Sequence, residues 1–277
     1  MFTLGIATYE DYDGLYFTIQ SVRLYHPLVT EIIIIDNNPD SKTGECNKKL
    51  QGESTSNCTI KYVPFTEKQS TSTKGEAFKH ATNEYVIICD SHILFPLNSI
   101  ECLKDYYLTH HKPYDLVQGP LLYDDLKNIS THLERKWRGN FYGIWATADI
   151  DEPFFEIPAM GMGVFSCKRD EWLGFNELFT GFGGEEFYIH DKYRKHGGRC
   201  ICLKDFKWVH RFNRPAGVPY TNTLSDRCFN YFTGRLELEQ DYADVADNFT
   251  NNGLSKQEVE RIFVKAYSLY TKNKVIR

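Results

Sequence analysis

Residues 84–92 read Glu-Tyr-Val-Ile-Ile-Cys-Asp-Ser-His, an apolar run that ends abruptly in polar side chains. The β-branched residues in this run are typical of a short buried strand. A strand buried on both faces belongs to a parallel sheet, and such sheets carry their chemistry at the carboxyl ends of the strands. Asp90 and His92 stand at that end, and both side chains can bind a divalent cation. The stretch therefore predicts an open α/β sheet with a metal site at its edge.

The sequence before this stretch contains two more strands of the same type. Residues 4–7 and 31–36 are apolar runs, and apolar side chains recur at helical spacing over residues 15–25. Two strand–helix units in succession form a parallel sheet with right-handed crossovers. Residues 40–58 are polar, so we expect a surface excursion there. Further strands and helices of the predicted sheet fall at residues 60–63, 72–81, 99–110 and 115–118.

The second half of the chain begins with an aromatic segment, residues 137–155, whose periodicity is weak. It suggests a pocket floor or a mobile lid, with packing in the core as the alternative. Residues 158–166 then place Gly161 and Gly163 before a strand, where the backbone must approach another group closely. A Gly-Gly-Glu-Glu run opens a helix over residues 185–196, because carboxylates are favoured in the first turn of a helix.

The C-terminal region is helical. Ser255 and Glu258 form a capping box, and an apolar stripe follows at helical spacing. We expect a catalytic domain over residues 1–235 and a helical C-terminal extension, residues 236–277, packed on it. The predicted fold class is α/β, with a Rossmann-like, mostly parallel sheet flanked by helices.

The composition is that of a packed globular protein. The 277 residues are 42% hydrophobic and 15% aromatic, which suffices for one large α/β domain with an appendage. The net charge of −5 disfavours a surface that binds nucleic acid as a whole, although it allows a local basic groove. No apolar run reaches the roughly 18 residues of a membrane span and no signal peptide is evident, so we expect a cytoplasmic protein. The eight cysteines lack a framework spacing, which favours reduced thiols.

Polar residues that follow strands or begin a helix are the candidates for chemistry: Asp90 with His92, Glu185 with Glu186, and His210. A cation held by one carboxylate and two imidazoles keeps open positions for substrate oxygens. A substrate diphosphate suits such a cation, because the metal neutralises charge that grows on a phosphate leaving group. The basic loop after His210 would complete the clamp through Arg211 or Arg214.

Each of these features also has a structural explanation. Asp90 can cap a turn, His92 can lie on the surface, and carboxylates at a helix start are favoured by the helix dipole alone. A single histidine such as His210 is more often structural than a ligand. Cys200 and Cys202 suggest zinc, but alternation on one strand face explains them equally well, and their spacing fits no zinc-finger signature.

Taken together, the sequence resembles nucleotide-sugar glycosyltransferases of the GT-A fold in the broad family 2 group. It is most similar to the catalytic domain of the polypeptide N-acetylgalactosaminyltransferases. Asp90-Ser91-His92 after a buried strand resembles that family's Asp-x-His metal motif, and residues 158–166 resemble its glycine-bearing segment under the donor sugar. The run that leads from the Gly-Gly-Glu-Glu block through a helix, a Gly-Gly pair and a strand to a histidine resembles the family's Gly-Gly-Glu-Asn block and its downstream metal ligand. The resemblance covers about residues 2–235.

The resemblance implies a binding site for each part of a UDP-sugar. It implies Mn²⁺, with Mg²⁺ as the alternative, bound by Asp90, His92 and His210. It places four residues around the uridine: Thr8, Tyr9, Glu10 and Asp36. The residues that it places around the donor sugar, the diphosphate and the reaction centre are Lys74, Gly161, Gly163, Gly184, Glu185, Glu186, Arg214 and Tyr220.

One departure from the family pattern concerns the reaction centre. Glu186 stands where the resembled family has Asn. Inverting relatives carry Glu-Asp at this place, and their second carboxylate is the general base on the acceptor hydroxyl, whereas retaining enzymes need no such base. We favour the inverting role for Glu186, with Glu185 beside it, and the retaining course stays open.

We therefore expect a metal-dependent transferase that moves a hexosyl or N-acetylhexosaminyl group from UDP to a hydroxyl. The acceptor is a glycan, a protein or a hydroxymethylated DNA base, and residues 137–155 and 211–225 are expected to form its side of the site. A nucleotidyltransferase is one alternative, but it would need a basic, glycine-rich phosphate loop after the first strand, which the sequence does not supply. A non-catalytic sugar-nucleotide or glycan-binding module is the other, and loss of a metal ligand would support it, yet all three candidates are present.

Overall fold

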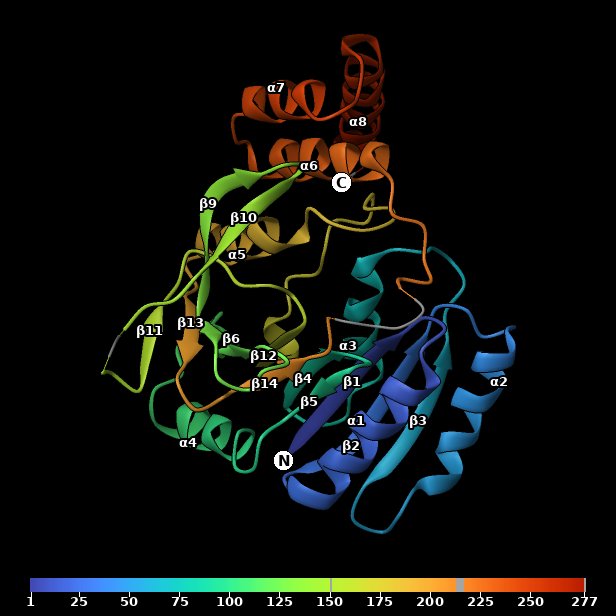
Figure 1. The fold of residues 1–277 in the computed structure, drawn as a ribbon, viewed down its shortest axis with the longest axis vertical. Coiled ribbons are helices and arrows are strands. Elements are labelled where there is room, and N and C mark those ends of the chain that lie inside the picture. The colour runs from blue at the N-terminus through green and yellow to red at the C-terminus, as the bar shows by residue number, and fades with distance from the viewer. Residues whose placement is uncertain (150, 213–216, 277) are drawn as a thin grey trace.

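The computed structural model describes residues 1–149, 151–212 and 217–276. Its centre is an eight-stranded, mostly parallel sheet in the order β11-β13-β6-β12-β4-β1-β2-β3 (Figure 1). These strands are β1 (Phe2–Thr8), β2 (Val29–Asp36), β3 (Thr59–Pro64), β4 (Tyr85–Asp90), β6 (Leu116–Gln118), β11 (Phe154–Glu156), β12 (Val164–Lys168) and β13 (Cys200–Leu203). Strand β12 runs antiparallel to both of its neighbours, β4 and β6, and β11 runs antiparallel to β13. The expected α/β fold class is confirmed.

The central strands form because their apolar runs are covered from both sides. Residues 32–35 of β2 and 86–89 of β4 are completely inaccessible to solvent, as their β-branched sequences predict. Helices α1 (Tyr12–Tyr25) and α2 (Lys42–Lys49) pack side by side, and α3 (Ala77–His80) packs against β1 and β2. Gly5 of β1 makes room for α3, because a Cβ at this position would collide with the side chain of Ala77.

Two segments differ from the expectation. Residues 40–58, expected as a surface excursion, contain the helices α2 and η1 (Leu50–Glu53), which the sequence analysis did not predict. Helix α2 buries only Gly44 and Asn47, so it leaves no apolar stripe in the sequence. Residues 72–81 are not one α-helix, because the 3-10 helix η2 (Thr71–Glu76) precedes the short α3. Residues 72–74 are buried in η2, which begins with the side chain of Ser70 accepting the Ser72 amide.

Two smaller sheets complete the structure around the strand ends. One is a hairpin of β9 (His132–Arg138) and β10 (Phe141–Ala146). The other has the order β5-β14-β7-β8 and consists of β5 (Ile93–Leu94), β14 (Trp208–His210), β7 (Leu121–Leu122) and β8 (Ile129–Ser130). Strand β14 pairs with β5 so that His210 lies opposite Ile93. This pairing returns the chain to the carboxyl end of β4.

The helices that remain before the C-terminal ones are α4 (Glu101–Thr109), the short η3 (Arg169–Glu171) and α5 (Glu185–Lys195). Helix α5 follows the Gly-Gly-Glu-Glu run, as predicted, and its buried face includes Phe187, Ile189 and Tyr193. Within the described ranges, no helix combines the length and the apolar character that crossing a membrane requires.

The C-terminal helices α6 (Leu224–Leu238), α7 (Ala243–Asn251) and α8 (Lys256–Ile276) build a second apolar core. They lie together at the top of the view, in orange and red (Figure 1). Trp137 and Tyr142 of the hairpin pack against this core, so part of the aromatic segment is core packing. The predicted capping box is present, since the Ser255 amide donates to Glu258 and the Glu258 amide donates to Ser255 Oγ. The division at residue 235 stays a prediction, and α6 spans this position.

Candidate active site

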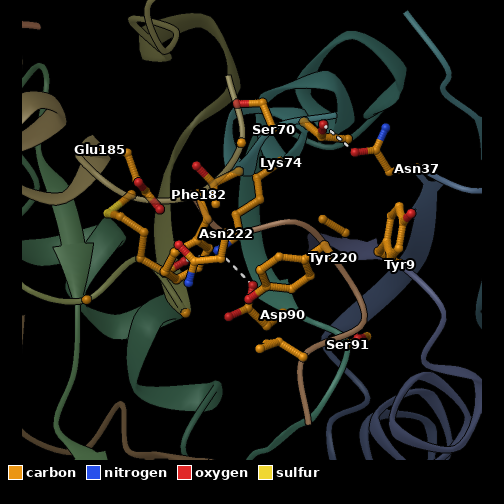
Figure 2. Close-up of a pocket in the computed structure, with 18 of the residues that line it drawn as sticks. Tyr9, Asn37, Ser70, Lys74, Asp90, Ser91, Phe182, Glu185, Tyr220 and Asn222 are labelled. Atoms are coloured by element: carbon orange, nitrogen blue, oxygen red, sulfur yellow. Dashed lines mark hydrogen bonds and ion pairs between the residues drawn. The ribbon is translucent and has the colours of Figure 1, made fainter. Parts of the chain in front are cut away.

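A cavity of about 560 Å³ opens at the carboxyl ends of β1 and β4. Its wall combines the η2 segment, the turn before β12, the start of α5 and the described part of the loop before α6 (Figure 2). The volume lies within the range of small-molecule and cofactor sites, which is about 300–1,000 Å³. The position, outside the carboxyl ends of parallel strands, is where open α/β sheets bind their ligands.

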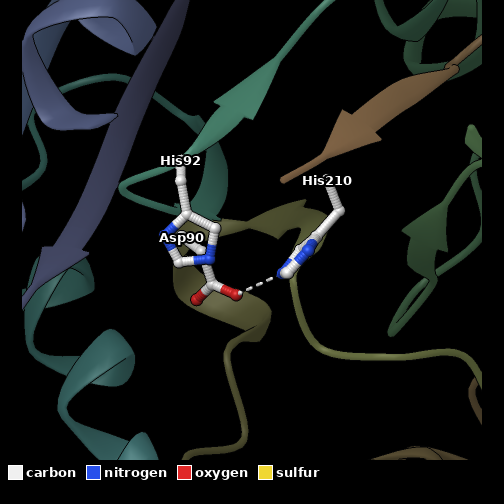
Figure 3. Close-up of side chains that lie close together, drawn as sticks. All are labelled: Asp90, His92 and His210. Carbon is white, nitrogen blue, oxygen red and sulfur yellow. Dashed lines mark ion pairs between the residues drawn. The ribbon is translucent and has the colours of Figure 1, made fainter. Parts of the chain in front are cut away.

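Asp90, His92 and His210 meet in the wall of this cavity. Asp90 ends β4, His92 follows it by two residues, and His210 ends β14. One ligand atom from each lies within 4.8 Å of the others, and the three side chains point toward one another (Figure 3). The Asp90 carboxylate is 3.6 Å from Nε2 of His210, and Nδ1 of His210 is buried with no hydrogen-bond partner. One carboxylate and two imidazoles form a donor set that suits Mn²⁺ and related divalent cations.

The protonation states in this cluster favour a cation. Burial by itself would raise the pKa of Asp90, but Lys74 and the two histidines hold that pKa well below its ordinary value. Burial lowers the pKa of His210, so its imidazole is neutral at pH 7 and keeps a lone pair for a metal. An ionised carboxylate beside neutral imidazole is the state in which these side chains bind metals.

Glu185 and Glu186 form the first turn of α5 and both line the cavity. The chain reaches this turn through Gly183 and Gly184, whose φ angles of +95° and +97° strain any residue that carries a Cβ. Burial raises the pKa of both carboxyls, and the charge of Glu185 adds to the effect on Glu186, whose pKa rises to about 8. One oxygen of Glu185 is buried without a hydrogen-bond partner. The pair is thus poised to hold or release a proton near neutral pH.

The structure brings most of the predicted substrate-binding residues to this cavity. The predicted residues that line it, apart from the metal cluster and the two glutamates, are Thr8, Tyr9, Lys74, Gly161, Gly163 and Tyr220. Tyr220 lies between Tyr9 and Phe182, and its ring stacks on that of Phe182 at 5.5 Å (Figure 2). Trp145 of the aromatic segment also lines the cavity.

Other predicted residues lie elsewhere. Asp36 is fully buried and accepts hydrogen bonds from Asn47, from the hydroxyl of Tyr62 and from the Asn38 amide, so its neighbour Asn37 forms the wall instead. Glu10 accepts a hydrogen bond from Asn38 and does not line the cavity. Gly184 caps α5 behind the wall, and Arg214 lies outside the described residues.

Several residues of the site carry no signal in the sequence. Asp11 bonds to His92, and Asp226 and Asn222 line the cavity next to α5. Gln118 donates to the carbonyls of Gly161 and Val164 and so supports the glycine-bearing turn. These side chains find their partners across long sequence separations, and only the N-cap position of Asp11 before α1 could have marked any of them.

The chain belongs to glycosyl transferase family 2, whose model matches residues 3–169, more than half of its length. The fold is that of a GT-A glycosyltransferase. A search of curated proteins finds no match.

Solved structures of glycosyltransferases share the whole fold at low sequence identity. GalNAc-T7 with UDP, GalNAc and Mn²⁺ is 14% identical with a TM-score of 0.68; the match covers 100% of this chain and 57% of that one. The mannosyltransferase PcManGT from Pyrobaculum calidifontis, with GDP-Man and Mn²⁺, is 13% identical with a TM-score of 0.57; 98% and 75% are covered. S. aureus TarS with UDP-GlcNAc is 12% identical with a TM-score of 0.55; 96% and 71% are covered. The chain spans little more than half of the GalNAc-T7 chain. The resemblance read from the sequence motifs is confirmed.

Proposed function

We propose that this family 2 transferase moves a sugar from a UDP donor to a neutral hydroxyl acceptor and depends on Mn²⁺. The observation that carries the proposal is the convergence of Asp90, His92 and His210 at one edge of a nucleotide-sized cavity. Three glycosyltransferases of the same fold were solved with nucleotide-sugar donors or their parts. At such low sequence identity, their similarity supports only the shared fold. The proposed donor and metal therefore depend on the residues of this chain.

Asp90, His92 and His210 would hold the metal, with positions left open for diphosphate oxygens. When bound, the ion would supply a Lewis acid that stabilises the negative charge of the departing UDP. Lys74 lies beside Asp90 and adds a buried positive charge on the same side of the cavity. We therefore assign Lys74 to the donor diphosphate. Tyr220, whose ring contacts those of both Tyr9 and Phe182, is assigned to cover the diphosphate.

Thr8, Tyr9 and Asn37 form the wall at the end of β1 and are assigned to the uridine. Thr8 Oγ1 is buried with no hydrogen-bond partner, so a nucleoside hydroxyl or carbonyl could satisfy it. Asp36 and Glu10 would support this wall without touching the uridine. Asp36 accepts hydrogen bonds from Asn47 and Tyr62, and Glu10 accepts one from Asn38.

Glu186 is proposed as the general base that removes the proton from the acceptor hydroxyl. Its raised pKa of about 8 makes it a stronger base than an ordinary carboxylate once it is ionised. Glu185, deeper and one residue earlier, would orient the donor sugar through its unpaired oxygen. A base on the acceptor gives the inverting course.

The charges of the cavity favour a neutral acceptor such as a glycan hydroxyl. Among the described lining residues Lys74 is the one lysine or arginine, and it pairs with Asp90 and is assigned to the donor diphosphate. The lining also contains the acidic residues Glu185, Glu186 and Asp226, which offer no positive charge to a phosphate. A phosphate-bearing acceptor such as DNA is therefore disfavoured here, whereas aromatic rings and carboxyl groups together suit a saccharide.

The proposal is tested by UDP release from a panel of UDP-sugars, with GDP-mannose as comparator, in Mn²⁺ and in EDTA. We expect slow hydrolysis of one UDP-sugar that needs the metal and is lost in Asp90→Ala. Asp170→Ala, which removes an exposed carboxylate far from the cavity, serves as the matched control. A bound donor at a hundredfold excess over its Kd should raise the free energy of unfolding by about 2–3 kcal/mol. Absence of turnover together with absence of this stabilisation would overturn the UDP-sugar assignment.

A further inference from the structure

Asp11 connects the first turn of α1 to the Asp-Ser-His turn. One of its carboxylate oxygens lies 2.9 Å from Nδ1 of His92 and 2.9 Å from Oγ of Ser91. Its other oxygen accepts the amide of Gly14 at 3.2 Å, as the N-cap of α1. The side chain is largely buried, at 15% exposure. The carboxylate is therefore held at three points.

This contact fixes the state of the His92 ring. An ionised carboxylate can only accept hydrogen bonds, so Nδ1 of His92 must carry the proton that it donates to Asp11. In the neutral imidazole the lone pair then belongs to Nε2. Nε2 is the nitrogen that remains for the side of Asp90 and His210 (Figure 3).

The backbone around His92 is held by the same helix. The hydroxyl of Thr18, on α1, lies 2.9 Å from the carbonyl of Ser91 and 2.7 Å from that of Ile93, and it accepts the Ile93 amide at 3.2 Å. Helix α1 and its N-cap thus hydrogen-bond to both the main chain and the side chains of this turn. His210 has no comparable support, because its Nδ1 is without a partner.

We propose that Asp11 is a positioning residue that selects the Nε2 lone pair of His92 and aims it at a divalent cation between Asp90 and His210. The inference rests on the metal site of the proposed function. Outer carboxylates on ligating histidines restrict ring rotation and make the ligand more basic, and their removal typically costs 10–100-fold in metal affinity. Asp11 acts through His92 and does not touch the metal or the substrate.

The test compares Asp11→Asn with Asp13→Asn, a change of the same chemistry at an exposed site in the same turn of α1. Asparagine is as good an N-cap as aspartate, so α1 keeps its start while the negative charge beside His92 is lost. Free Mn²⁺ is titrated by electron paramagnetic resonance without any donor, and imidazole ¹⁵N shifts of the metal-free protein report the tautomer of His92.

We expect Asp11→Asn to weaken Mn²⁺ binding about 10–100-fold and to mix the two tautomers of His92, with Asp13→Asn unchanged. Native affinity and a single tautomer in Asp11→Asn, alongside loss of Mn²⁺ binding in Asp90→Ala, would overturn the role of Asp11 and leave the proposed function standing. Equal Mn²⁺ titrations for the native protein and Asp90→Ala would overturn both.

Discussion

The ammonium group of Lys74 lies 2.7 Å from one carboxylate oxygen of Asp90 and 2.7 Å from the carbonyl of Met162. The other Asp90 oxygen faces His210, so the ion pair and a metal can use different atoms of one carboxylate. Burial by itself would lower the pKa of Lys74, but Asp90 and Glu185 raise it above its ordinary value. Lys74 is therefore charged and compensates two acidic groups in the wall of the cavity.

Replacing Lys74 by methionine should destabilise the metal-free protein by about 3–5 kcal/mol, because Asp90 and Glu185 would lose their buried counter-charge. Mn²⁺ should restore part of this loss, since it supplies positive charge to the same carboxylate. Urea unfolding with and without Mn²⁺ measures both effects. Lys68→Met is the control, since Lys68 is partly exposed and its ammonium donates to the backbone carbonyl of Glu177 rather than to a buried carboxylate. An unchanged unfolding midpoint in Lys74→Met would contradict the prediction.

The pH dependence of turnover should follow Glu186. Its pKa of about 8 arises from burial first and from the charge of Glu185 second. A general base must be ionised, so kcat/KM should rise with pH and level off above about pH 8. Glu186→Gln should lower the rate by about 10²–10⁴-fold and flatten this profile. A Glu186→Gln enzyme that keeps the native profile would remove the general-base assignment.

The same group should make folding stability depend on pH. The folded pKa of Glu186 lies above the ordinary value of 4.5, so the folded state binds a proton more tightly than the unfolded state does. This proton binding stabilises the fold fully below pH 4.5, and the stabilisation is lost as the pH rises toward about 8. Glu186→Gln removes the titrating group, so it should unfold at higher urea than the native protein near pH 9 and show no such advantage near pH 4. Urea midpoints across this range provide the measurement, and parallel curves for the two proteins would refute the linkage.

Three glycine-to-alanine changes should fall in a definite order of cost. A Cβ at Gly163 would lie 2.9 Å from the ring of Trp208, which is buried and held by a bond to the Gly119 carbonyl. At Gly161 the Cβ would lie 2.5 Å from the ring of Trp145, which is half-buried and borders the open cavity, so this ring has space to shift. At Gly52 nothing lies within 4 Å.

We expect Gly163→Ala to cost about 1–3 kcal/mol, as overpacking of a rigid site does, and Gly161→Ala to cost less. Gly52→Ala should leave the unfolding free energy nearly unchanged. Denaturant titration of the three variants gives the order directly. A Gly52 variant as unstable as the Gly163 variant would show that packing against Trp208 is not the cause.

The central sheet could be predicted because its strands are buried on both faces. Residues 32–35 and 86–89 are continuous apolar runs, and no other element explains such a run followed at once by polar residues. Helix α2 could not be predicted from periodicity, because only Gly44 and Asn47 are buried in it. Its sequence signal is local, the cap that Ser41 provides to the Gly44 amide.

The candidate site likewise contains residues that the sequence pattern predicts and residues that it does not. Asp90 and His210 each end an apolar strand, so their approach to one sheet edge follows from the strand pattern and the family motif. The partner of His92 is Asp11, 81 residues away in the sequence, and its role depends on how α1 docks on the turn. Asn37 forms the wall where Asp36 was expected, because alternation along the strand end turns Asp36 toward Asn47 and Tyr62.

Strand β12 has a consequence for how the protein is made. It is inserted between β4 and β6, yet residues 164–168 follow both neighbours in the chain. During synthesis, the apolar edge of β4 therefore stays unpaired on the order of ten seconds after it leaves the ribosome. An open apolar edge is a template for association with other chains. The nascent protein should thus need protection by chaperones in this interval, and fragments that stop before residue 164 should aggregate.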